Sequence, residues 1–462
     1  MTDTNTSFAQ SVDYEALLKD HPIGDDFVAM ATTISADALR AHQERLFAKL
    51  VARAGATAFY QRLWGKVGLE PGDIRSLDDL PKLPTFGKQE IVESIGLAPP
   101  FGDFAGLDSY PDGQRPPMIF HTTSGTTGKP QPLFFGAKTR EVQNLLLARL
   151  FRWQGMNPTD VVHSVYGHGM INGGHYIREA VTRFTSATFM SAGTGIETRS
   201  AAQIALMRDF GATIILGFTD YIKKLAEVAR AEGLIPGKDI NIRMISGQFG
   251  REDKQAVSDL WGGAACYDWY GVGDTGMIAG EGPDRDGHYV MEDAHWVEIC
   301  DIETGALVPD GQTGDLIVTC LFKDDVYPII RFNTHDVTAI RTDASKIGIK
   351  FKRIEGFLGR SDNMVKLRGI NVFPQAVGPM LAEIQSFAGE WVCKVSRDSA
   401  GRDELTVVCE DRGDGQIGAY QDTLKRKLGI EARIELVAPG GTGHATQIEA
   451  RQKPIRLLDE RS

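Results

Sequence analysis

The sequence predicts an α/β protein: a large N-terminal domain with mostly parallel sheets plus a β-barrel-like region, and a small α+β C-terminal domain. Between residues 161 and 270, short runs rich in β-branched and aromatic residues alternate with helical stretches, which is typical of a parallel sheet covered on both faces. From residue 287 to about 341, consecutive strands are separated by turn signals, which favours an antiparallel sheet or barrel. The C-terminal residues then give helix, strand, strand, helix and strand.

The length of 462 residues is more than one ordinary hydrophobic core supports, so two or more domains are expected. The polar stretch at residues 359–362, GRSD, marks the expected boundary. The domains are therefore predicted at residues 1–360 and 361–462.

The individual elements follow from periodicity and turn residues. Leucines at helical spacing predict a helix from residue 36 to about 53, with Ser35 as a candidate N-cap. Further helices are expected at 58–67, 140–151, 221–231, 251–260, 374–387 and 417–428. The strands of the parallel sheet are expected at 161–166, 188–191, 212–218, 242–246 and 265–270, and those of the small domain at 391–396, 404–410 and 433–437.

Composition and charge exclude several classes of protein. The net charge of -11 argues against nonspecific binding to nucleic acid or to an anionic membrane. No apolar run approaches the roughly 20 residues of a membrane-spanning helix, and the N-terminal residues lack the pattern of a signal peptide. The five cysteines lie far apart without C-x-x-C spacing, so a reducing, cytoplasmic location without a cysteine zinc site is expected.

The stretch HTTSGTTGKP at residues 121–130 is the strongest candidate for an anion site. Its glycines allow a tight turn, and successive backbone N–H groups in such a turn form a concave anion-binding surface. A Walker-type phosphate loop is excluded, because only two residues separate the glycines and a proline follows the lysine. An ordinary polar turn between strands remains the alternative. The candidate phosphate-binding residues are Ser124, Gly125, Thr126, Thr127, Gly128 and Lys129.

This stretch resembles the phosphate loop of the adenylate-forming superfamily (acyl-CoA synthetases, AMP-binding enzymes). With its preceding histidine, it is most similar to that of the phenylacetate–CoA ligase family. Five further stretches, spread from about residue 59 to residue 461, resemble the same family in the same order. The resemblance implies a large AMP-binding domain, a small mobile domain and a homodimer. It also implies ATP, Mg²⁺ and coenzyme A as cofactors, and an aromatic carboxylic acid as the substrate.

The first of these stretches, YGHGM at residues 166–170, is implied to line the acyl pocket. Tyr166 could pack against a substrate ring, although a core tyrosine at a strand end is the alternative. The carboxylate of Asp220, with the imidazoles of His168 and His175 on the facing segment, would suit an aromatic substrate that carries a hydroxyl or amino group, because a buried polar group needs a partner. The alternative is that Asp220 caps a helix starting at Tyr221. The implied pocket residues are Tyr166, His168, Gly169, Asp220, Tyr221 and Gly247.

The second stretch, DWYGVGD at residues 268–274, is implied to contact the nucleotide through Asp268, Tyr270 and Gly271. The family has a glutamate that helps to hold Mg²⁺ at the position of Asp274, and a serine or threonine in front of it where this chain has glycine. Aspartate can still ligate the metal, because Mg²⁺ prefers oxygen ligands. In SGQF at residues 246–249, Phe249 replaces another family acid and is expected to make the pocket wall more apolar.

The remaining stretches match the family positions that bind the ribose, form the hinge and supply the catalytic lysine. Asp336 is implied to accept hydrogen bonds from the ribose hydroxyls, although it could be a plain turn aspartate. Arg360 is implied to lie near the nucleotide, Asp362 to be the hinge, and Gly369 to line the thiol tunnel. The alternative for this region is a polar linker. Near the C-terminus, Lys453 matches the adenylation lysine, with a solvated basic tail as the alternative.

These observations predict an acid–thiol ligase that activates an aryl carboxylic acid, phenylacetate- or benzoate-like, to its acyl-adenylate and then transfers the acyl group to coenzyme A. Lys129 and Lys453 are the expected catalytic residues. Transfer to a carrier-protein thiol or to an amine remains open. A nucleotide-binding protein that has lost turnover is the alternative from another class, because the residues at 273 and 274 depart from the family pattern.

Overall fold

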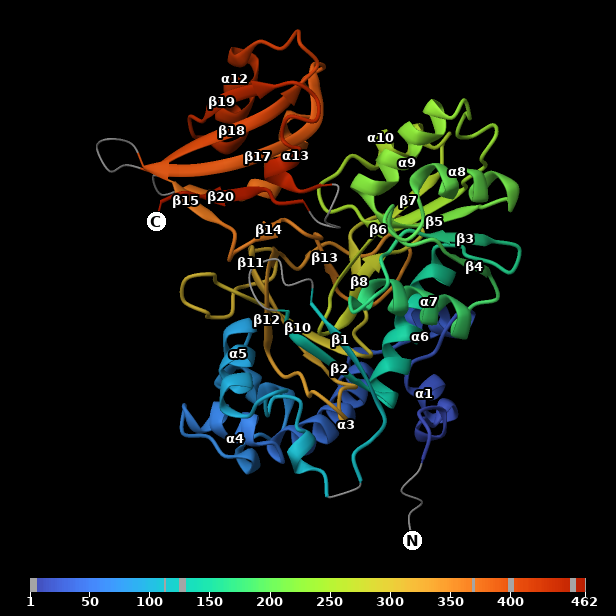
Figure 1. Cartoon of the computed structure of the whole chain (residues 1–462). Helices are drawn as coiled ribbons and strands as arrows, with labels where there is room; N and C mark the ends of the chain where they lie inside the picture. The colour runs from blue at the N-terminus through green and yellow to red at the C-terminus, as the bar shows by residue number, and fades with distance from the viewer. Residues whose placement is uncertain are drawn as a thin grey trace. The chain divides into compact units, whose positions relative to one another are not determined.

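A computed structural model describes residues 6–111, 114–123, 130–367, 370–397, 403–448 and 454–461. The chain divides into two compact units (Figure 1). The first contains residues 1–249, 254–334 and 338–356. The second contains residues 357–462 together with the short segments 250–253 and 335–337. The chain is thus a mixed α/β protein with a large sheet-containing unit and a separate C-terminal unit.

The N-terminal part of the first unit is helical. Ser35 accepts a hydrogen bond from the backbone N–H of Ala38, so the predicted N-cap of the long helix α3 is confirmed. The carboxylate of Asp13 and the hydroxyl of Thr57 cap two other helices in the same way. The helices are α1 (Tyr14–Asp20), α2 (Asp25–Thr33), α3 (Ala36–Gly55), α4 (Ala58–Gly65) and α5 (Lys88–Leu97).

An eight-stranded sheet forms the centre of the first unit, with strand order β13-β9-β8-β7-β6-β5-β3-β4. The predicted parallel arrangement is confirmed for its strands β4, β3, β5, β6 and β7, while β8, β9 and β13 are antiparallel. The strands are β3 (Val161–Ser164), β4 (Thr188–Ser191), β5 (Ile214–Phe218), β6 (Met244–Gln248), β7 (Ala265–Val272), β8 (Gly276–Glu281), β9 (His288–Val290) and β13 (Arg353–Ile354).

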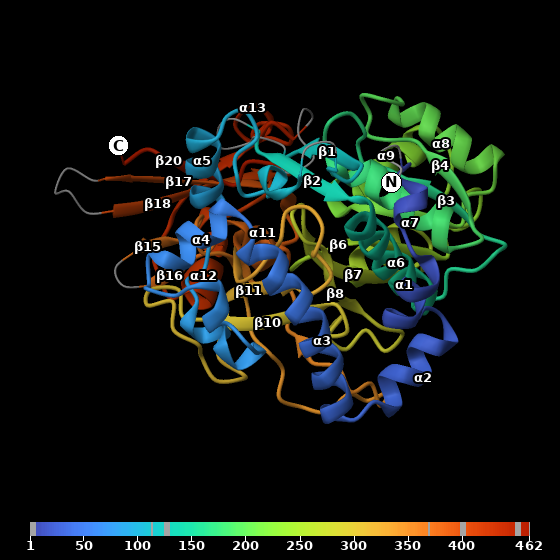
Figure 2. The same cartoon turned by 90° about the horizontal axis from the view of Figure 1, so that it is seen from below.

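Helices cover the sheet because each parallel connection returns through one. α6 (Ala137–Trp153) and α7 (Asn172–Phe184) pack against each other (Figure 2). The helices α8 (Ser200–Asp209), α9 (Thr219–Ala231) and α10 (Lys254–Leu260) supply a second buried cluster. We call the cluster of buried apolar residues between these helices and the sheet the rear cluster; it includes Ile215, Ile245, Cys266, Trp261 and Phe249.

The predicted barrel-like region is not confirmed. The described strands there form a sheet of order β10-β11-β12-β14, and a separate hairpin pairs β1 with β2. Their bounds are β1 (Met118–Thr122), β2 (Pro132–Gly136), β10 (His295–Cys300), β11 (Gly314–Cys320), β12 (Phe332–Thr338) and β14 (Gly359–Arg360).

A buried ion pair joins helix α6 to the segment between β9 and β10. Arg149, on α6, donates to both carboxylate oxygens of Asp293 at 2.9 and 2.8 Å, and His21 lies 3.2 Å from the same carboxylate. Both ionic side chains are nearly inaccessible to solvent. His42 and Gln43 on α3 contact the backbone carbonyls of Asp293 and its neighbour Glu292.

The second unit has a sheet of order β19-β18-β17-β20, covered by α12 around a core that includes Trp391 and Tyr420. The predicted helix at 374–387 is wrong in its extent. Only residues 374–381 are helical. The backbone N–H of Ile384 then donates to the carbonyl of Leu381 in a turn, and β17 begins at Phe387. The elements are β15 (Val365–Leu367), β16 (Ile370–Val372), α11 (Val377–Leu381), β17 (Phe387–Arg397), β18 (Asp403–Asp411), α12 (Ile417–Leu428), β19 (Arg433–Val437), α13 (Gly443–Thr446) and β20 (Leu457–Asp459).

We predict that Arg149→Met lowers the free energy of unfolding of the first unit by about 3–5 kcal/mol, because it leaves the buried Asp293 carboxylate without its partner. The double variant Arg149→Met/Asp293→Leu should be more stable than the single one, since it removes both charges. Urea unfolding followed by tryptophan fluorescence measures both. Arg208→Met, which removes an exposed arginine, is the control. Equal midpoints for wild type and Arg149→Met would contradict this account.

Candidate active site

The carboxyl ends of the parallel strands bring several expected site residues together, as is usual for ligand sites in such sheets. Gly247 on β6 lies between Gly217 on β5 and Asp268 on β7. A Cβ at position 247 would lie 2.0 Å from the carbonyl oxygen of Gly217, so only glycine fits between these strand ends. Gly247 therefore has a packing requirement of its own, in addition to its expected place in the acyl pocket.

Asp268 is buried and its carboxylate is engaged within the chain. One oxygen accepts the backbone N–H of Phe249 at 2.8 Å, and the other lies 3.2 Å from Nε2 of His288. Its own N–H donates to Glu281. These contacts fix the end of β7, and the expected nucleotide contact stays a prediction. Phe249 is 3% exposed and belongs to the rear cluster. Its expected effect on the polarity of the pocket wall stays a prediction.

Beyond Asp268, the chain turns from β7 into β8. Tyr270 is buried, and the pairing register shifts between Tyr270 and Gly271. A Cβ on Gly271 would lie 2.3 Å from the carbonyl oxygen of Gly276, which explains the glycine. The turn after β7 then presents Asp274, the expected metal ligand.

Asp274 is held by two residues that sequence reasoning missed. The hydroxyl of Tyr327 donates to Oδ1 of Asp274 at 2.7 Å, and the ammonium of Lys323 donates to its backbone carbonyl at 3.3 Å. Lys323 is fully buried, with its ammonium 4.6 Å from the ring centroid of Tyr327 and 5.5 Å from that of Phe135. Burial raises the pKa of Asp274 and lowers that of Lys323. A lysine directly after the apolar residues 320–322 was the signal available in the sequence.

The carboxylate of Asp274 fits a magnesium ion. Tyr327 donates to Oδ1, which leaves Oδ2 able to ligate a metal ion. Mg²⁺ is often held by one or two carboxylates plus phosphate oxygens of the substrate, so one open carboxylate oxygen is sufficient. In the described part of the chain, no group of three or more histidine, cysteine or acidic side chains could hold a metal without such a substrate.

The expected acyl-pocket segment follows β3. Tyr166 is buried, with its ring centroid 5.0 Å from that of Phe218 and 6.4 Å from that of Trp269. The backbone N–H of His168 donates to Glu197 at 3.0 Å. Burial, and then the neighbouring His175, lower the pKa of His168.

A row of three imidazoles connects this segment with the hairpin. The rings of His168 and His175 meet edge to face at 5.2 Å, and His175 stacks on His121 at 4.9 Å. Nε2 of His175 also contacts the carbonyl of Gly169, whose φ of +69° suits glycine. Burial, with Arg140 and His175 nearby, lowers the pKa of His121 to about 4, so its ring is neutral at neutral pH.

Asp220 and Tyr221 lie on α9. The helix begins at Thr219, so the alternative that Asp220 is the N-cap is wrong. Its carboxylate lies in the first turn, where an acid favours the helix dipole, 3.6 Å from the Lys223 ammonium. The hydroxyl of Tyr221 contacts Ser200 at 3.0 Å and Gln203 at 3.1 Å, so it anchors α8.

In the second unit, one arginine joins the expected ribose ligand to the expected hinge. Arg360 donates to Oδ1 of Asp336 at 2.9 Å, and to the two oxygens of Asp362 at 2.7 and 2.5 Å. Asp336 and Arg360 are also paired across β12 and β14. The motif residues predicted separately for these roles therefore form one ionic group.

The remaining expected residues lie outside the described part of the chain: Ser124, Gly125, Thr126, Thr127, Gly128, Lys129, Gly369 and Lys453. The segments beside the candidate phosphate loop are described. The backbone N–H of Thr123 donates to the carbonyl of Gln131 at 2.9 Å, and the N–H of Gln131 donates to the Thr123 hydroxyl at 3.0 Å. The β1–β2 hairpin thus holds the two ends of this loop side by side.

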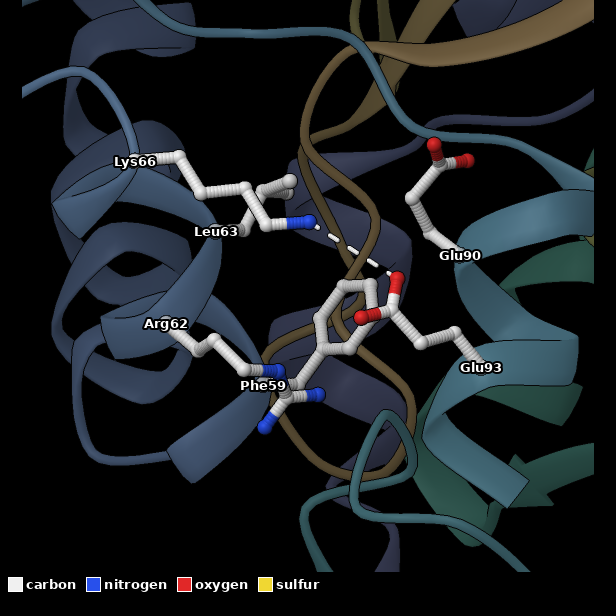
Figure 3. Close-up of a pocket in the computed structure, with 6 residues that line it drawn as sticks. All are labelled: Phe59, Arg62, Leu63, Lys66, Glu90 and Glu93. Carbon is white, nitrogen blue, oxygen red and sulfur yellow. Dashed lines mark ion pairs between the residues drawn. The ribbon is translucent and has the colours of Figure 1, made fainter. Parts of the chain in front are cut away.

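A surface pocket lies between α4 and α5, lined by Phe59, Arg62, Leu63, Lys66, Glu90 and Glu93 (Figure 3). Lys66 reaches across it to Glu93 at 3.7 Å. None of the expected site residues lines this pocket, and we assign it no function. Among the described residues, no helix is both long enough and apolar enough to span a membrane.

Comparisons with known proteins agree with this arrangement. The family model described as the AMP-binding enzyme C-terminal domain matches residues 369–461. A phenylacetate-coenzyme A ligase of Pseudomonas putida is 30% identical over 429 residues, which cover 88% of this chain and 92% of the relative. One from Aromatoleum evansii is 28% identical over 446 residues, covering 92% and 96%.

Solved structures give the same result. A 2-hydroxyisobutyryl-CoA ligase in the postadenylation state, in complex with R3-HIB-AMP, has a TM-score of 0.80 and 25% identity, covering 94% of this chain and 92% of that one. The same ligase in complex with 2-HIB-AMP and CoA has a TM-score of 0.66 and 25% identity, covering 96% and 95%. These likenesses confirm the resemblance inferred from the motifs. The chain belongs to the phenylacetate–coenzyme A ligase family, and it is an AMP-forming acid–coenzyme A ligase.

Proposed function

We propose that the acid activated by this ligase is aromatic, phenylacetate- or benzoate-like. The observation that carries this proposal is the contact of Tyr166 with Phe218 and Trp269 at the carboxyl ends of the strands. Aromatic side chains supply large apolar surfaces for a flat ring, and they prefer offset or edge-to-face contacts. The names of the curated relatives, phenylacetate-coenzyme A ligases, support the same substrate class.

The reaction has two steps. In the first, a carboxylate oxygen of the acid attacks the α-phosphorus of ATP, the bond to the β-phosphate oxygen breaks, and pyrophosphate leaves. In the second, the thiol of coenzyme A attacks the acyl carbon of the acyl-adenylate, AMP leaves, and the thiol proton is released. Phosphoryl transfer depends mainly on positioning and charge stabilisation, so these are the tasks of the protein.

We assign these tasks to the residues described above. Asp274 would hold Mg²⁺ through Oδ2, and the metal when bound offsets phosphate charge. Asp336 would accept the ribose hydroxyls, with Arg360 fixing the orientation of its carboxylate. The acid would be surrounded by Tyr166, His168, Gly169, Asp220, Tyr221 and Gly247. The phosphate loop at 124–129 would hold the β- and γ-phosphates, and Lys453 would act on the α-phosphate.

Exchange of labelled pyrophosphate into ATP tests the proposal directly, because it requires only the first step. We expect arylacetates or benzoates to stimulate exchange more than aliphatic acids of similar size. Mass spectrometry with coenzyme A should then detect the aryl thioester. Stimulation by aliphatic acids alone would refute the aromatic substrate class. ATP binding without exchange for any acid would instead indicate a nucleotide-binding protein that has lost turnover.

Lys453 should act only in the first step. We predict that Lys453→Ala binds ATP nearly normally and forms the acyl-adenylate about a hundred- to a thousandfold more slowly, roughly the cost of losing one transition-state donor. The same variant should convert chemically prepared acyl-adenylate and coenzyme A to thioester at nearly the wild-type rate, because the small domain turns about Asp362 between steps. Equal losses in both half-reactions would refute this division of roles.

Asp274 should set the metal requirement. We predict that Asp274→Asn raises the Mg²⁺ concentration needed for half-maximal adenylation about tenfold or more, because an amide oxygen carries no net charge. Asp274→Glu should lower that concentration and keep activity, since the longer side chain brings its carboxylate closer to the phosphates. Magnesium titrations of the adenylation rate measure both. A metal requirement unchanged in Asp274→Asn would exclude Asp274 as a ligand.

A further inference from the structure

Four side chains from neighbouring strand ends share the sheet face opposite the rear cluster. Ile215, Ile245 and Cys266 belong to that cluster on β5, β6 and β7. Successive side chains of a strand alternate between faces, so the residues three positions further on point to the other face. Those residues are Phe218, Gln248 and Trp269, and Tyr166 joins them through its contacts with Phe218 and Trp269. We call these four residues the strand-end row.

Two members of the strand-end row carry buried polar atoms without partners. Tyr166 is 3% exposed and Trp269 is 6% exposed. Within the described residues, neither the Tyr166 hydroxyl nor the Trp269 indole Nε1 makes a hydrogen bond. Buried polar groups are nearly always paired, because an unpaired donor loses its hydrogen bonds to water without replacement. Two neighbouring side chains with unpaired buried polar atoms therefore require an explanation.

Other buried tyrosines of the same unit are satisfied by the chain itself. The hydroxyl of Tyr176 on α7 donates to the carbonyl of Gln143 at 3.0 Å and accepts the N–H of Met277 at 3.2 Å. The hydroxyl of Tyr60 donates to the carbonyl of Pro328 and accepts the N–H of Ile330. The hydroxyl of Tyr166 thus differs from those of Tyr176 and Tyr60 in having no partner within the described residues.

We infer that the strand-end row binds a hydroxyl group on the aromatic ring of the substrate, so that the preferred acid is a hydroxyaryl acid. The indole N–H can only donate, whereas the tyrosine hydroxyl can donate or accept. A phenolic hydroxyl has two acceptor lone pairs and one donor, so its chemistry complements either group. Gln248, partly exposed on the strand between Phe218 and Trp269, adds an amide that can donate or accept.

This inference rests on the proposed function, because it concerns the same acyl pocket. A site built to pair with a substrate hydroxyl discriminates strongly against an analogue that lacks it, since the groups of the site are then left unpaired. A methyl group fills nearly the same volume as a hydroxyl and makes no such bond. The ratio of kcat/KM between a hydroxyaryl acid and its methyl isostere therefore reports on this contact.

The experiment measures pyrophosphate release with phenylacetate, its three hydroxyphenyl isomers and its three methylphenyl isomers. At least one hydroxyl isomer should exceed its methyl isostere about tenfold or more in kcat/KM, roughly the net worth of one hydrogen bond. Tyr166→Phe should reduce that ratio several-fold, because it removes the hydroxyl that pairs with the substrate and keeps the ring. Tyr176→Phe, which removes a paired hydroxyl from the same unit, should leave the ratio as in wild type.

The thermal midpoint of the free enzyme provides a second measurement. Tyr166→Phe should leave the midpoint unchanged or higher, because it removes an unpaired polar atom, whereas Tyr176→Phe should lower it. A hydroxyl-to-methyl ratio of one or less for every isomer, or a ratio unaffected by Tyr166→Phe, would overturn the inference. In either case the enzyme would still release pyrophosphate from ATP with unsubstituted phenylacetate as the acid. Absence of release with every acid would instead refute the proposed function, and this inference with it.

Discussion

The first unit depends on keeping the buried Asp293 carboxylate charged and paired. Asp293 lies between β9 and β10, where the chain leaves the central sheet for the four-stranded one, and Arg149 and His21 reach it from α6 and from the end of α1. Removing two such charges from water costs several kcal/mol per ion, so the elements that carry them must meet in one arrangement. The first turn of α6 also contacts the segment that holds Asp274, because the backbone N–H of Thr139 donates to Asp325. The same short segment carries Lys323 and Tyr327 to Asp274. The geometry of the candidate metal ligand thus follows from how α6 is held.

In the second unit, Arg360 has a comparable role on a smaller scale. It binds Asp336 and Asp362 together, the two acids proposed for the ribose and for the hinge. A guanidinium offers several donors in a rigid planar fork, so it can serve both carboxylates at once, which a lysine could not do with the same geometry. Because Asp362 is partly exposed and Asp336 is buried, the Asp336 contact is the better shielded of the two. The proposed ribose ligand and the proposed hinge are thereby linked through one side chain.

The sequence predicted those features that depend on residues close together in the chain. The parallel strands, the long helix α3 and its cap at Ser35 follow from periodicity and from side-chain chemistry within a few residues. The contacts of Asp274 with Lys323 and Tyr327 were missed because they join residues about fifty positions apart, and no short motif encodes them. The burial of Phe249 in the rear cluster was likewise not predicted, because it depends on residues from several helices and strands. Likewise, only the helical register set by Thr219 places Asp220 inside α9 rather than at its cap.

The two-step reaction requires a covalent acyl-adenylate that forms before coenzyme A takes part. Wild-type enzyme, mixed with ATP, Mg²⁺ and its best aryl acid but without coenzyme A, can be quenched in acid and analysed by mass spectrometry. The account predicts acyl-adenylate bound at up to one per active site, together with an equal amount of pyrophosphate. Adding coenzyme A should convert the bound intermediate to aryl-CoA and AMP. Formation of ADP with an acyl phosphate, or of thioester without any detectable adenylate, would contradict the account.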